Sequence, residues 1–281
     1  MDSLDVLVGP ALVATAHGGG LRAGPGLEGY AAGELASGGR GQVLAPWPNR
    51  LRDGRWSWRG RALQLPLSDP ATRTASHGLV RWARWDVVGP GRLEHVLAPL
   101  PGYPFWLRLA ATYTVDGPDA WSVTHTATNL SDSPAPFGFG QHPYLTAGTP
   151  LVDDAELELR AGRQLDADDR GLPAGERASD GFSGHLGGAV LDATVTELAR
   201  DADGRVRAVL RGPDRSVTLW ADEAFRWFQV FTGDTLAPDR RRRGLAVEPM
   251  TCPPDALASG RDLVTLEPGE TWTGSWGVAV A

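Results

Sequence analysis

His142 stands in one of four short stretches of this chain whose residue types could move protons. It lies in the segment FGFGQHPYL, residues 137–145, where glycines precede it and a proline follows. Because Pro143 fixes its own φ and favours an extended residue before it, His142 is expected at a rigid strand end. An imidazole held beside an open space can exchange protons near neutral pH. A buried structural histidine would produce the same pattern, so this stretch alone leaves both interpretations open.

A carboxylate occupies a comparable position near the C-terminus. Glu248 follows the apolar run GLAV, and prolines at 249, 253 and 254 stiffen the chain after it. A carboxylate and an imidazole whose pKa values are separated by their surroundings are suited to general acid–base catalysis. The pair His142 and Glu248 therefore indicates proton transfer as the chemistry to test first.

Two further stretches offer hydrogen-bonding side chains on stiff turns. Asn49 and Arg50 end the proline-rich segment APWPNR, residues 45–50, and His77 precedes Gly78 before a strand-like run. A guanidinium on a rigid loop can give a fork of donors to a ligand oxygen. An arginine in such a loop also commonly pairs with a nearby aspartate, so a binding role for Arg50 needs support from the other stretches.

Other catalytic chemistries find less support in the sequence. There is no GxSxG nucleophile elbow. Cys252 has no basic neighbour and is followed by two prolines, which favours a structural thiol over a nucleophile. His77, His142 and Glu248 are residue types that bind zinc, but the chain lacks HExxH or any paired-ligand spacing. We therefore predict no metal site and no cofactor.

Short alternating strands are expected to position these stretches. The clearest are residues 105–115 and 121–129, whose apolar side chains recur at every second position. Hairpins are predicted for residues 56–65 and 205–220, and His125 falls among apolar positions and is expected inside. Residues 160–190 are polar and glycine-rich and predict loops, while the arginine run at 240–243 predicts a solvated connection.

The fold class follows from the number of short strands and the lack of helical periodicity. No long amphipathic helix, internal repeat, low-complexity block or linker is found. Many short strands separated by Gly, Pro and Asp turns predict an all-β protein, an antiparallel sandwich or barrel, with residues 1–281 forming a single domain.

Composition bounds the partners of the protein. The 281 residues carry a formal net charge of −7, which argues against nonspecific nucleic-acid binding. The single cysteine excludes an intrachain disulfide, and no signal peptide or membrane-spanning segment is predicted. A cytoplasmic protein that binds neither nucleic acid nor membrane is therefore expected.

Taken together, the four stretches resemble a known family. The segments PWPNRLRDGR at 46–55, HGLVR at 77–81, GQHPY at 140–144 and EPMTC at 248–252 are similar to the signature segments of the aldose 1-epimerase (galactose mutarotase) family, in the same order. The resemblance spans nearly the whole chain. It implies a large antiparallel β-supersandwich, a small-molecule sugar substrate, and a monomer or weak homodimer. It also implies cofactor-independent interconversion of the α and β anomers of a free hexose such as glucose or galactose.

The same resemblance implies roles for individual residues. Glu248 matches the general base that removes the proton from the anomeric O1, and His142 matches the general acid that protonates the ring oxygen. A bell-shaped pH profile is then expected, with an acidic limb from the carboxylate and a basic limb from the imidazolium. The substrate-binding positions that the resemblance implies are Asn49, Arg50, His77, Asp192 and Gln229.

Two alternatives remain at the level of the sequence. A non-catalytic carbohydrate-binding protein of the same fold would not need both His142 and Glu248. A mutarotase of hexose phosphates would need several basic side chains at one end of its site. Arg50 is the only basic residue in a motif that resembles the family's binding residues, and alternation on the strand expected after His77 would send Arg81 and Arg84 to opposite faces. Unphosphorylated hexoses are therefore expected.

Overall fold

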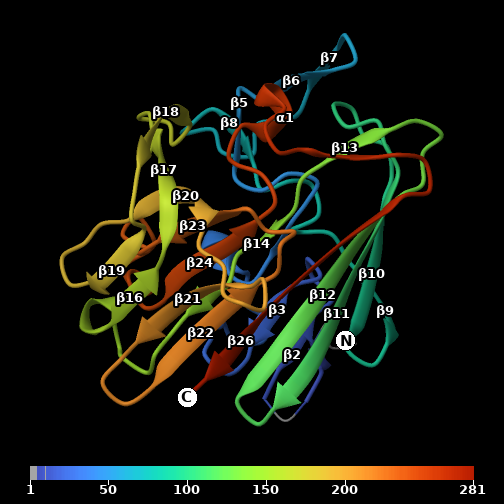
Figure 1. Ribbon diagram of the computed structural model, residues 1–281. Helices are drawn as coiled ribbons and strands as arrows, with labels where there is room; N and C mark the ends of the chain where they lie inside the picture. The colour runs from blue at the N-terminus through green and yellow to red at the C-terminus, as the bar shows by residue number, and fades with distance from the viewer. Residues whose placement is uncertain (1–4, 10) are drawn as a thin grey trace.

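Strands make up about half of the protein, and helices very little of it. The computed structural model describes residues 5–9 and 11–281, of which 49% lie in strands and 4% in helices (Figure 1). The helical pieces are η1 (Ser37–Gly39), η2 (Val152–Asp154) and α1 (Ala256–Ser259). The predicted all-β class is confirmed.

The larger sheet has nine antiparallel strands. It contains two long neighbours, β11 (Leu107–Gly117) and β12 (Ala120–Asn129), which correspond to the two clearest strands of the sequence. The full order across the sheet is β19 (Phe182–His185), β16 (Glu156–Leu159), β21 (Val206–Arg211), β22 (Ser216–Ala221), β26 (Thr271–Val280), β12, β11, β10 (Arg92–Leu97) and β9 (Asp86–Gly89).

The second sheet has eight strands and carries most of the motifs. Its order is β18 (Pro173–Ala178), β17 (Ala161–Ala167), β20 (Asp192–Leu198), β23 (Trp227–Phe231), β24 (Leu245–Met250), β14 (Gly140–Gln141) and β4 (Val43–Leu44), and β15 (Tyr144–Leu145) also pairs with β24. One hydrophobic cluster takes side chains from both sheets, including Leu219 and Trp276 from the first and Val230 and Val247 from the second. The predicted β-sandwich is therefore confirmed.

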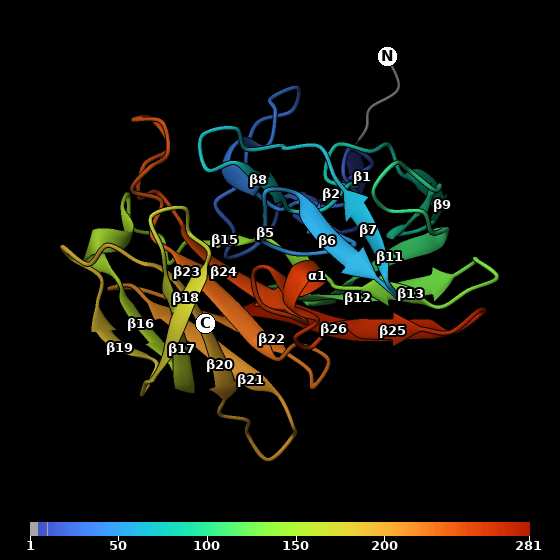
Figure 2. The ribbon, with the colours of Figure 1, turned by 90° about the horizontal axis from the view of Figure 1, so that it is seen from above.

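Small ribbons surround the two sheets. The ribbons β5–β8 and β6–β7 lie close to α1, which contacts β5 and β6 (Figures 1 and 2). The predicted hairpin at residues 56–65 is the β6–β7 ribbon. The strands of these ribbons and small sheets are β1 (Asp5–Leu7), β2 (Val13–Thr15), β3 (Leu21–Ala23), β5 (Arg50–Arg52), β6 (Arg55–Trp58), β7 (Arg61–Gln64), β8 (Thr74–Ser76), β13 (Ala135–Phe137) and β25 (Val264–Leu266).

The expectation of loops at residues 160–190 is wrong. This part of the chain forms β17, β18 and β19, and the last two are the outermost strands of their sheets. Most side chains of β18 and β19 are exposed or half-buried. An edge strand that is wet on both faces shows no apolar alternation, so the period-two signal on which the sequence argument relied is missing.

The arginine run at 240–243 is also not simply solvated. Arg242 Nε pairs with Asp153 at 2.9 Å, and its Nη1 donates to Asp234 and to the Ala189 carbonyl oxygen at 2.8 Å each. The side chain is only 12% exposed. The spacing of charges along a loop does not reveal such a partner, because Asp153 and Ala189 lie far away in the sequence.

A buried amide joins the two sheets beside the candidate site. Gln141 lies in β14 of the smaller sheet, and its Oε1 accepts hydrogen bonds from His125 Nε2 at 2.7 Å and Trp276 Nε1 at 3.1 Å, both in the larger sheet. Its Nε2 donates to the Tyr113 hydroxyl at 3.1 Å and to the Gly41 carbonyl oxygen at 3.0 Å. His125 is thus an internal residue, as the sequence predicted.

We expect Gln141→Leu to lower the free energy of unfolding by about 3 kcal/mol or more, because several buried polar groups each lose a partner at about 1–3 kcal/mol. Urea denaturation measures the change. The matched control is Thr124→Val, which removes a hydroxyl bonded to Ser275 on the exposed face of the larger sheet and should change stability by no more than about 0.5 kcal/mol. Equal, small effects of both substitutions would contradict the role given to Gln141.

Candidate active site

All seven residues singled out from the sequence line one cleft. The cleft has a volume of about 540 Å³ and takes side chains from β5, β20, β23 and β24 and from the turns after β8 and β14. A separate cleft of about 300 Å³, lined by residues such as Leu12 and Trp121, carries no titratable side chain. The residues that the structure brings together are Asn49, Arg50, His77, His142, Asp192, Gln229 and Glu248.

The register of one strand pairing sets His142 opposite Glu248. Strand β24 pairs Met250 with Gly140 before the histidine and Ala246 with Tyr144 after it. Residue 142 therefore falls level with residue 248. His142 Nε2 lies 3.2 Å from Glu248 Oε1, and the two side chains are 6% and 2% exposed.

A row of polar side chains continues from Glu248 across the sheet. Gln229 is the register partner of Glu248, and Thr194 is the register partner of Gln229. Gln229 Oε1 accepts from Asn49 Nδ2 at 3.3 Å and from the Thr194 hydroxyl, while its Nε2 donates to Asp192 Oδ1. Thr194 was not among the residues singled out from the sequence, although its period-two spacing from Asp192 on β20 places both side chains on one face.

His77 owes its position to a strained turn. Its own φ is +63° and that of Gly78 is +72°. A Cβ on Gly78 would come within 2.0 Å of the Ala45 carbonyl oxygen, so only glycine fits there. The His77 amide donates to the Asn49 carbonyl oxygen at 2.8 Å, and its ring centre lies 5.5 Å from that of His142.

A second arginine lines the cleft, contrary to the sequence argument. Residues 77–85 form turns and isolated bridges before β9 begins, so strand alternation does not apply to Arg81. Arg81 and Asp69 both line the cleft, and burial lowers the pKa of Arg81 while the negative charge of Asp69 acts in the opposite direction. The Arg81 guanidinium lies 5.4 Å from the ring centre of Trp82, which is 45% exposed.

His142 is backed by an aromatic ring and a buried arginine. The rings of His142 and Tyr144 are nearly parallel, at 7°, with centres 5.0 Å apart. The Arg40 guanidinium lies 4.4 Å from the Tyr144 ring centre, and Arg40 is 1% exposed. Its Nη1 donates to the Ser37 carbonyl oxygen at 3.2 Å and hydroxyl at 3.0 Å. This arrangement fixes the imidazole plane and places a positive charge behind it.

Burial favours the uncharged forms of the central pair. It lowers the pKa of His142 to about 3, with the charge of Arg40 as the next cause. It also raises the pKa of Glu248 well above its usual range, and the negative charge of Asp192 acts in the same direction. The 3.2 Å contact favours the ion pair, but His142 Nδ1 and Glu248 Oε2 have no hydrogen-bond partner among the described residues, so lost hydration outweighs it.

Burial also dominates at His77. It lowers the pKa of this imidazole well below its usual range, and a positive charge on His142 would lower it further.

Within residues 5–9 and 11–281, no group of three or more His, Cys, Asp or Glu side chains is arranged to hold a metal ion. The zinc ligand set considered from the sequence thus does not form in that part of the chain.

A profile of the aldose 1-epimerase family matches residues 27–278 of this chain. The chain belongs to the aldose 1-epimerase family. This family acts on sugars. The uncharacterized protein YihR of Escherichia coli (strain K12) is 33% identical over 238 residues, which cover 82% of this chain and 75% of YihR.

Solved structures of the family have the same fold. The GalM/aldose epimerase homologue from C. elegans matches with a TM-score of 0.82 at 16% identity, covering 99% of this chain and 98% of the homologue. The galactose 1-epimerase from Lactobacillus acidophilus NCFM matches with a TM-score of 0.79 at 18% identity, covering 100% and 92%. The fold implied by the sequence motifs is therefore confirmed. Across the described residues, no helix has the length and apolar character needed to span a membrane.

We expect the His142 imidazole to remain uncharged in the folded protein from pH 8 down to about pH 4, because burial places its pKa at about 3. NMR of histidine-labelled protein measures this, with the signal assigned by its loss in His142→Asn. In the urea-unfolded chain the same imidazole should titrate near about pH 6.5, the ordinary value. A midpoint near 6.5 in the folded state would show that burial does not control this group.

Proposed function

We propose that this protein is an aldose 1-epimerase that interconverts the α and β anomers of a free hexose such as glucose or galactose. The observation that carries the proposal is the contact between His142 Nε2 and Glu248 Oε1 at 3.2 Å inside the polar cleft. The two oxygens that must exchange protons, O1 and the ring oxygen O5, are both bonded to C1 of the sugar. An acid and a base in direct contact suit such neighbouring targets.

Ring opening requires one proton to leave and another to arrive. The Glu248 carboxylate takes the proton of O1, and the His142 imidazolium gives its proton to O5 as the C1–O5 bond breaks. The product is an open-chain aldehyde beside a protonated Glu248 and a neutral His142. After rotation about the C1–C2 bond, O5 adds to the other face of the aldehyde carbon and re-forms the C1–O5 bond, while His142 takes the proton of the O5 hydroxyl and Glu248 gives its proton to the aldehyde oxygen. Apart from the C1–O5 bond, which breaks and re-forms, only protons are transferred, so this chemistry requires no cofactor.

A bound sugar can supply the hydrogen-bond partners that Glu248 and His142 lack in the sugar-free site. Glu248 Oε2 and His142 Nδ1 are buried without partners among the described residues, and sugar hydroxyls can hydrogen-bond such groups. Hydrogen bonds to the carboxylate favour its charged form and move the shared proton towards His142. In this account the remaining polar side chains, Asn49, Arg50, His77, Asp192 and Gln229, hold the other hydroxyls.

We expect Glu248→Gln and His142→Asn each to fold normally and to lose about 10²–10⁴-fold in anomer interconversion, the usual weight of a general base or acid. Polarimetry of freshly dissolved α-D-glucose and α-D-galactose measures the rate. The matched controls are Glu156→Gln and His185→Asn, a glutamate and a histidine that are register partners at the exposed edge of the larger sheet. They should keep the wild-type rate.

A wild-type protein that binds hexoses without accelerating mutarotation would favour the non-catalytic carbohydrate-binding alternative. Near-wild-type rates in folded Glu248→Gln or His142→Asn would remove that residue from the mechanism. The simultaneous presence of a buried acid and a buried base is what supports catalysis over binding alone, because a binder has no need to bury both.

The pH dependence of kcat/KM shows which of the two groups, His142 or Glu248, loses its proton first as the pH rises. Burial favours loss of the first proton from His142 and the second from Glu248, the reverse of the order expected from the sequence. In His142→Asn the residual rate depends on Glu248 ionisation alone. Its acidic limb should therefore move to higher pH than in the wild type, towards the raised pKa of Glu248. An acidic limb that stays in place would mean that Glu248 already controls it in the wild type.

We further propose that the substrates are unphosphorylated. Arg50 and Arg81 both line the cleft, but so do the carboxylates of Asp69, Asp192 and Glu248. Burial lowers the pKa of Arg81 and the negative charge of Asp69 raises it, so Arg81 interacts electrostatically with a carboxylate of the protein itself. A phosphate dianion would meet repulsion from the Asp69 and Asp192 carboxylates, and because Asp69 already faces Arg81, Arg50 alone would be left to offset it.

We expect kcat/KM for glucose and galactose to exceed that for glucose 6-phosphate at equal ionic strength. Polarimetry with the three α-anomers measures it. The control variant is Arg81→Gln, which should leave the preference for the neutral sugar in place. A preference for the phosphorylated sugar of about tenfold or more, equivalent to about 1.4 kcal/mol, would overturn the assignment and point to Arg81 as its phosphate ligand.

A further inference from the structure

The turn between β17 and β18 contacts the guanidinium of Arg50. A Cβ placed on Gly171 would lie 2.8 Å from Arg50 Nη1, 3.0 Å from Cζ and 3.3 Å from Nε. The backbone of Gly171 therefore lies close to the guanidinium, and a methyl group at this position would require the guanidinium to move. Gly171 also has a φ of +72°, which glycine adopts without strain.

A small cavity of about 30 Å³ adjoins the main cleft beside Arg50. Both spaces are lined by Asn49, Arg50, Asp192 and Gln229, and the small cavity is completed by the β17–β18 turn, including Gly171. Arg50 Nε is buried and has no hydrogen-bond partner among the described residues. Within the described part of the chain, no hydrogen bond or ion pair holds the Arg50 guanidinium, so its closeness to this turn is what restrains it.

The turn itself is rigid. Asp168 Oδ1 accepts hydrogen bonds from the amides of Arg170 and Leu172 at 2.9 Å each. The Gly171 amide donates to the Asp168 carbonyl oxygen at 3.0 Å, and the Asp168 amide donates to the Leu172 carbonyl oxygen at 2.8 Å. These four bonds close the turn on both sides of Gly171.

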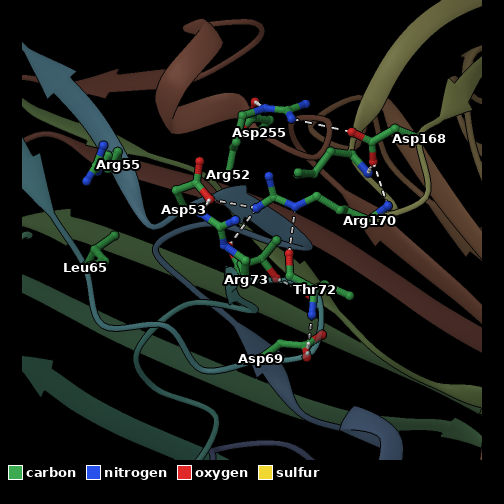
Figure 3. A network of polar contacts seen from close by, with 12 residues as sticks. Arg52, Asp53, Arg55, Leu65, Asp69, Thr72, Arg73, Asp168, Arg170 and Asp255 are labelled. Carbon is green, nitrogen blue, oxygen red and sulfur yellow. Dashed lines mark hydrogen bonds and ion pairs between the residues drawn. The ribbon is translucent and has the colours of Figure 1, made fainter.

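Arg170 fastens this rigid turn to the β5–β8 ribbon, whose first residue is Arg50. Figure 3 shows its side chain reaching Asp53 and the chain at Thr72 and Arg73. Arg170 Nη2 lies 2.8 Å from Asp53 Oδ1 and 2.9 Å from the Arg73 carbonyl oxygen, and its Nε lies 2.8 Å from the Thr72 carbonyl oxygen. Three acceptors fix the orientation of the planar Arg170 guanidinium, whereas a single exposed ion pair would not.

The other side of the ribbon is held as well. Asp255 Oδ1 accepts from the Arg52 amide at 2.8 Å, and the Asp255 amide donates to the Arg50 carbonyl oxygen at 2.7 Å. Arg52 Nη1 lies 3.4 Å from Asp168 Oδ2, which ties the turn to the same strand a second time (Figure 3). Hydrogen bonds therefore hold the backbone of Arg50, and the β17–β18 turn limits the position of the guanidinium at the far end of its side chain.

We propose that the β17–β18 turn is a positioning element of the sugar site, in which Arg170 is the anchor and Gly171 is the surface that holds the Arg50 guanidinium in its binding orientation. The proposal rests on the proposed function. Orienting a long side chain before the ligand arrives removes part of the entropy cost of binding. The device therefore acts on affinity, while the proton transfers at His142 and Glu248 do not depend on it.

The first test is Gly171→Ala against Gly204→Ala. Both glycines have positive φ, +72° and +78°, but a Cβ on Gly204 meets nothing within 4 Å. Backbone strain is therefore matched, and only the Gly171 variant displaces the guanidinium. We expect KM for galactose to rise about tenfold in Gly171→Ala with kcat within about twofold, and both constants to stay at wild-type values in Gly204→Ala. Equal KM in the two variants would overturn the proposal.

A second test does not depend on whether Gly171→Ala folds. Arg170→Gln should raise KM several-fold in the wild type and leave KM unchanged in the Arg50→Met background, because Arg170 acts through Arg50. Arg170→Lys, which keeps the charge opposite Asp53, should recover part of the loss. A rise in KM of the same factor in both backgrounds would mean that Arg170 only supports the fold, and would overturn its role as anchor.

Direct binding separates this inference from the proposed function. Isothermal titration calorimetry with galactose requires no turnover. Wild-type binding together with equal dissociation constants for Gly171→Ala and Gly204→Ala would contradict this inference alone. A wild-type protein that binds neither galactose nor glucose would contradict the proposed function and this inference with it.

Discussion

The side-chain amide of Gln141 is the contact on which the geometry of the site depends. It lies on β14 of the smaller sheet and is bonded on both sides to groups from β11, β12 and β26 of the larger one. His142 is the next residue, so the position of the imidazole relative to the core follows from this amide. Because a buried amide is stable only when its donors and acceptors are satisfied together, the packing of the two sheets and the placement of His142 are one requirement.

Much of the site could be predicted from the sequence because its residues stand where the backbone is stiff. Pro143 follows His142, Pro249 follows Glu248, and prolines precede Asn49, so the chain marks these three candidate positions locally. The contact between His142 and Glu248 was not predictable in the same way. It arises from a register that pairs Gly140 with Met250, and such pairing depends on residues more than one hundred positions apart.

The parts that the sequence did not reveal share a physical cause. Strands β18 and β19 are the outermost strands of their sheets and their side chains are exposed or half-buried, so their alternation is invisible, and with it the turn before β18 that approaches Arg50. Arg81 was assigned to a strand, although strained turns at His77 and Gly78 redirect the chain into the cleft. In each case a tertiary contact overrides a local pattern.

The electrostatics of the pair favour the protonation state that His142 and Glu248 would have beside an open-chain sugar. Burial stabilises a neutral His142 beside a protonated Glu248, which is the state that proposed ring opening would produce. The cyclic sugar needs the opposite, charged state, and its hydroxyls can supply the partners that Glu248 Oε2 and His142 Nδ1 lack. If the two protonation states of the pair are close in free energy, the bound cyclic sugar and the bound open-chain sugar are also brought closer in free energy. This favours ring opening and reclosure alike.

His142 and Glu248 are proposed to act as one proton-exchanging unit, and the double variant His142→Asn/Glu248→Gln is the sharpest test of that coupling. Exchange NMR of C1-labelled glucose gives the anomer interconversion rate for the wild type, both single variants and the double variant. Residues that act as a unit are strongly non-additive, so the account predicts a double variant within about threefold of the slower single variant. Losses that multiply would show two independent contributions and contradict the account.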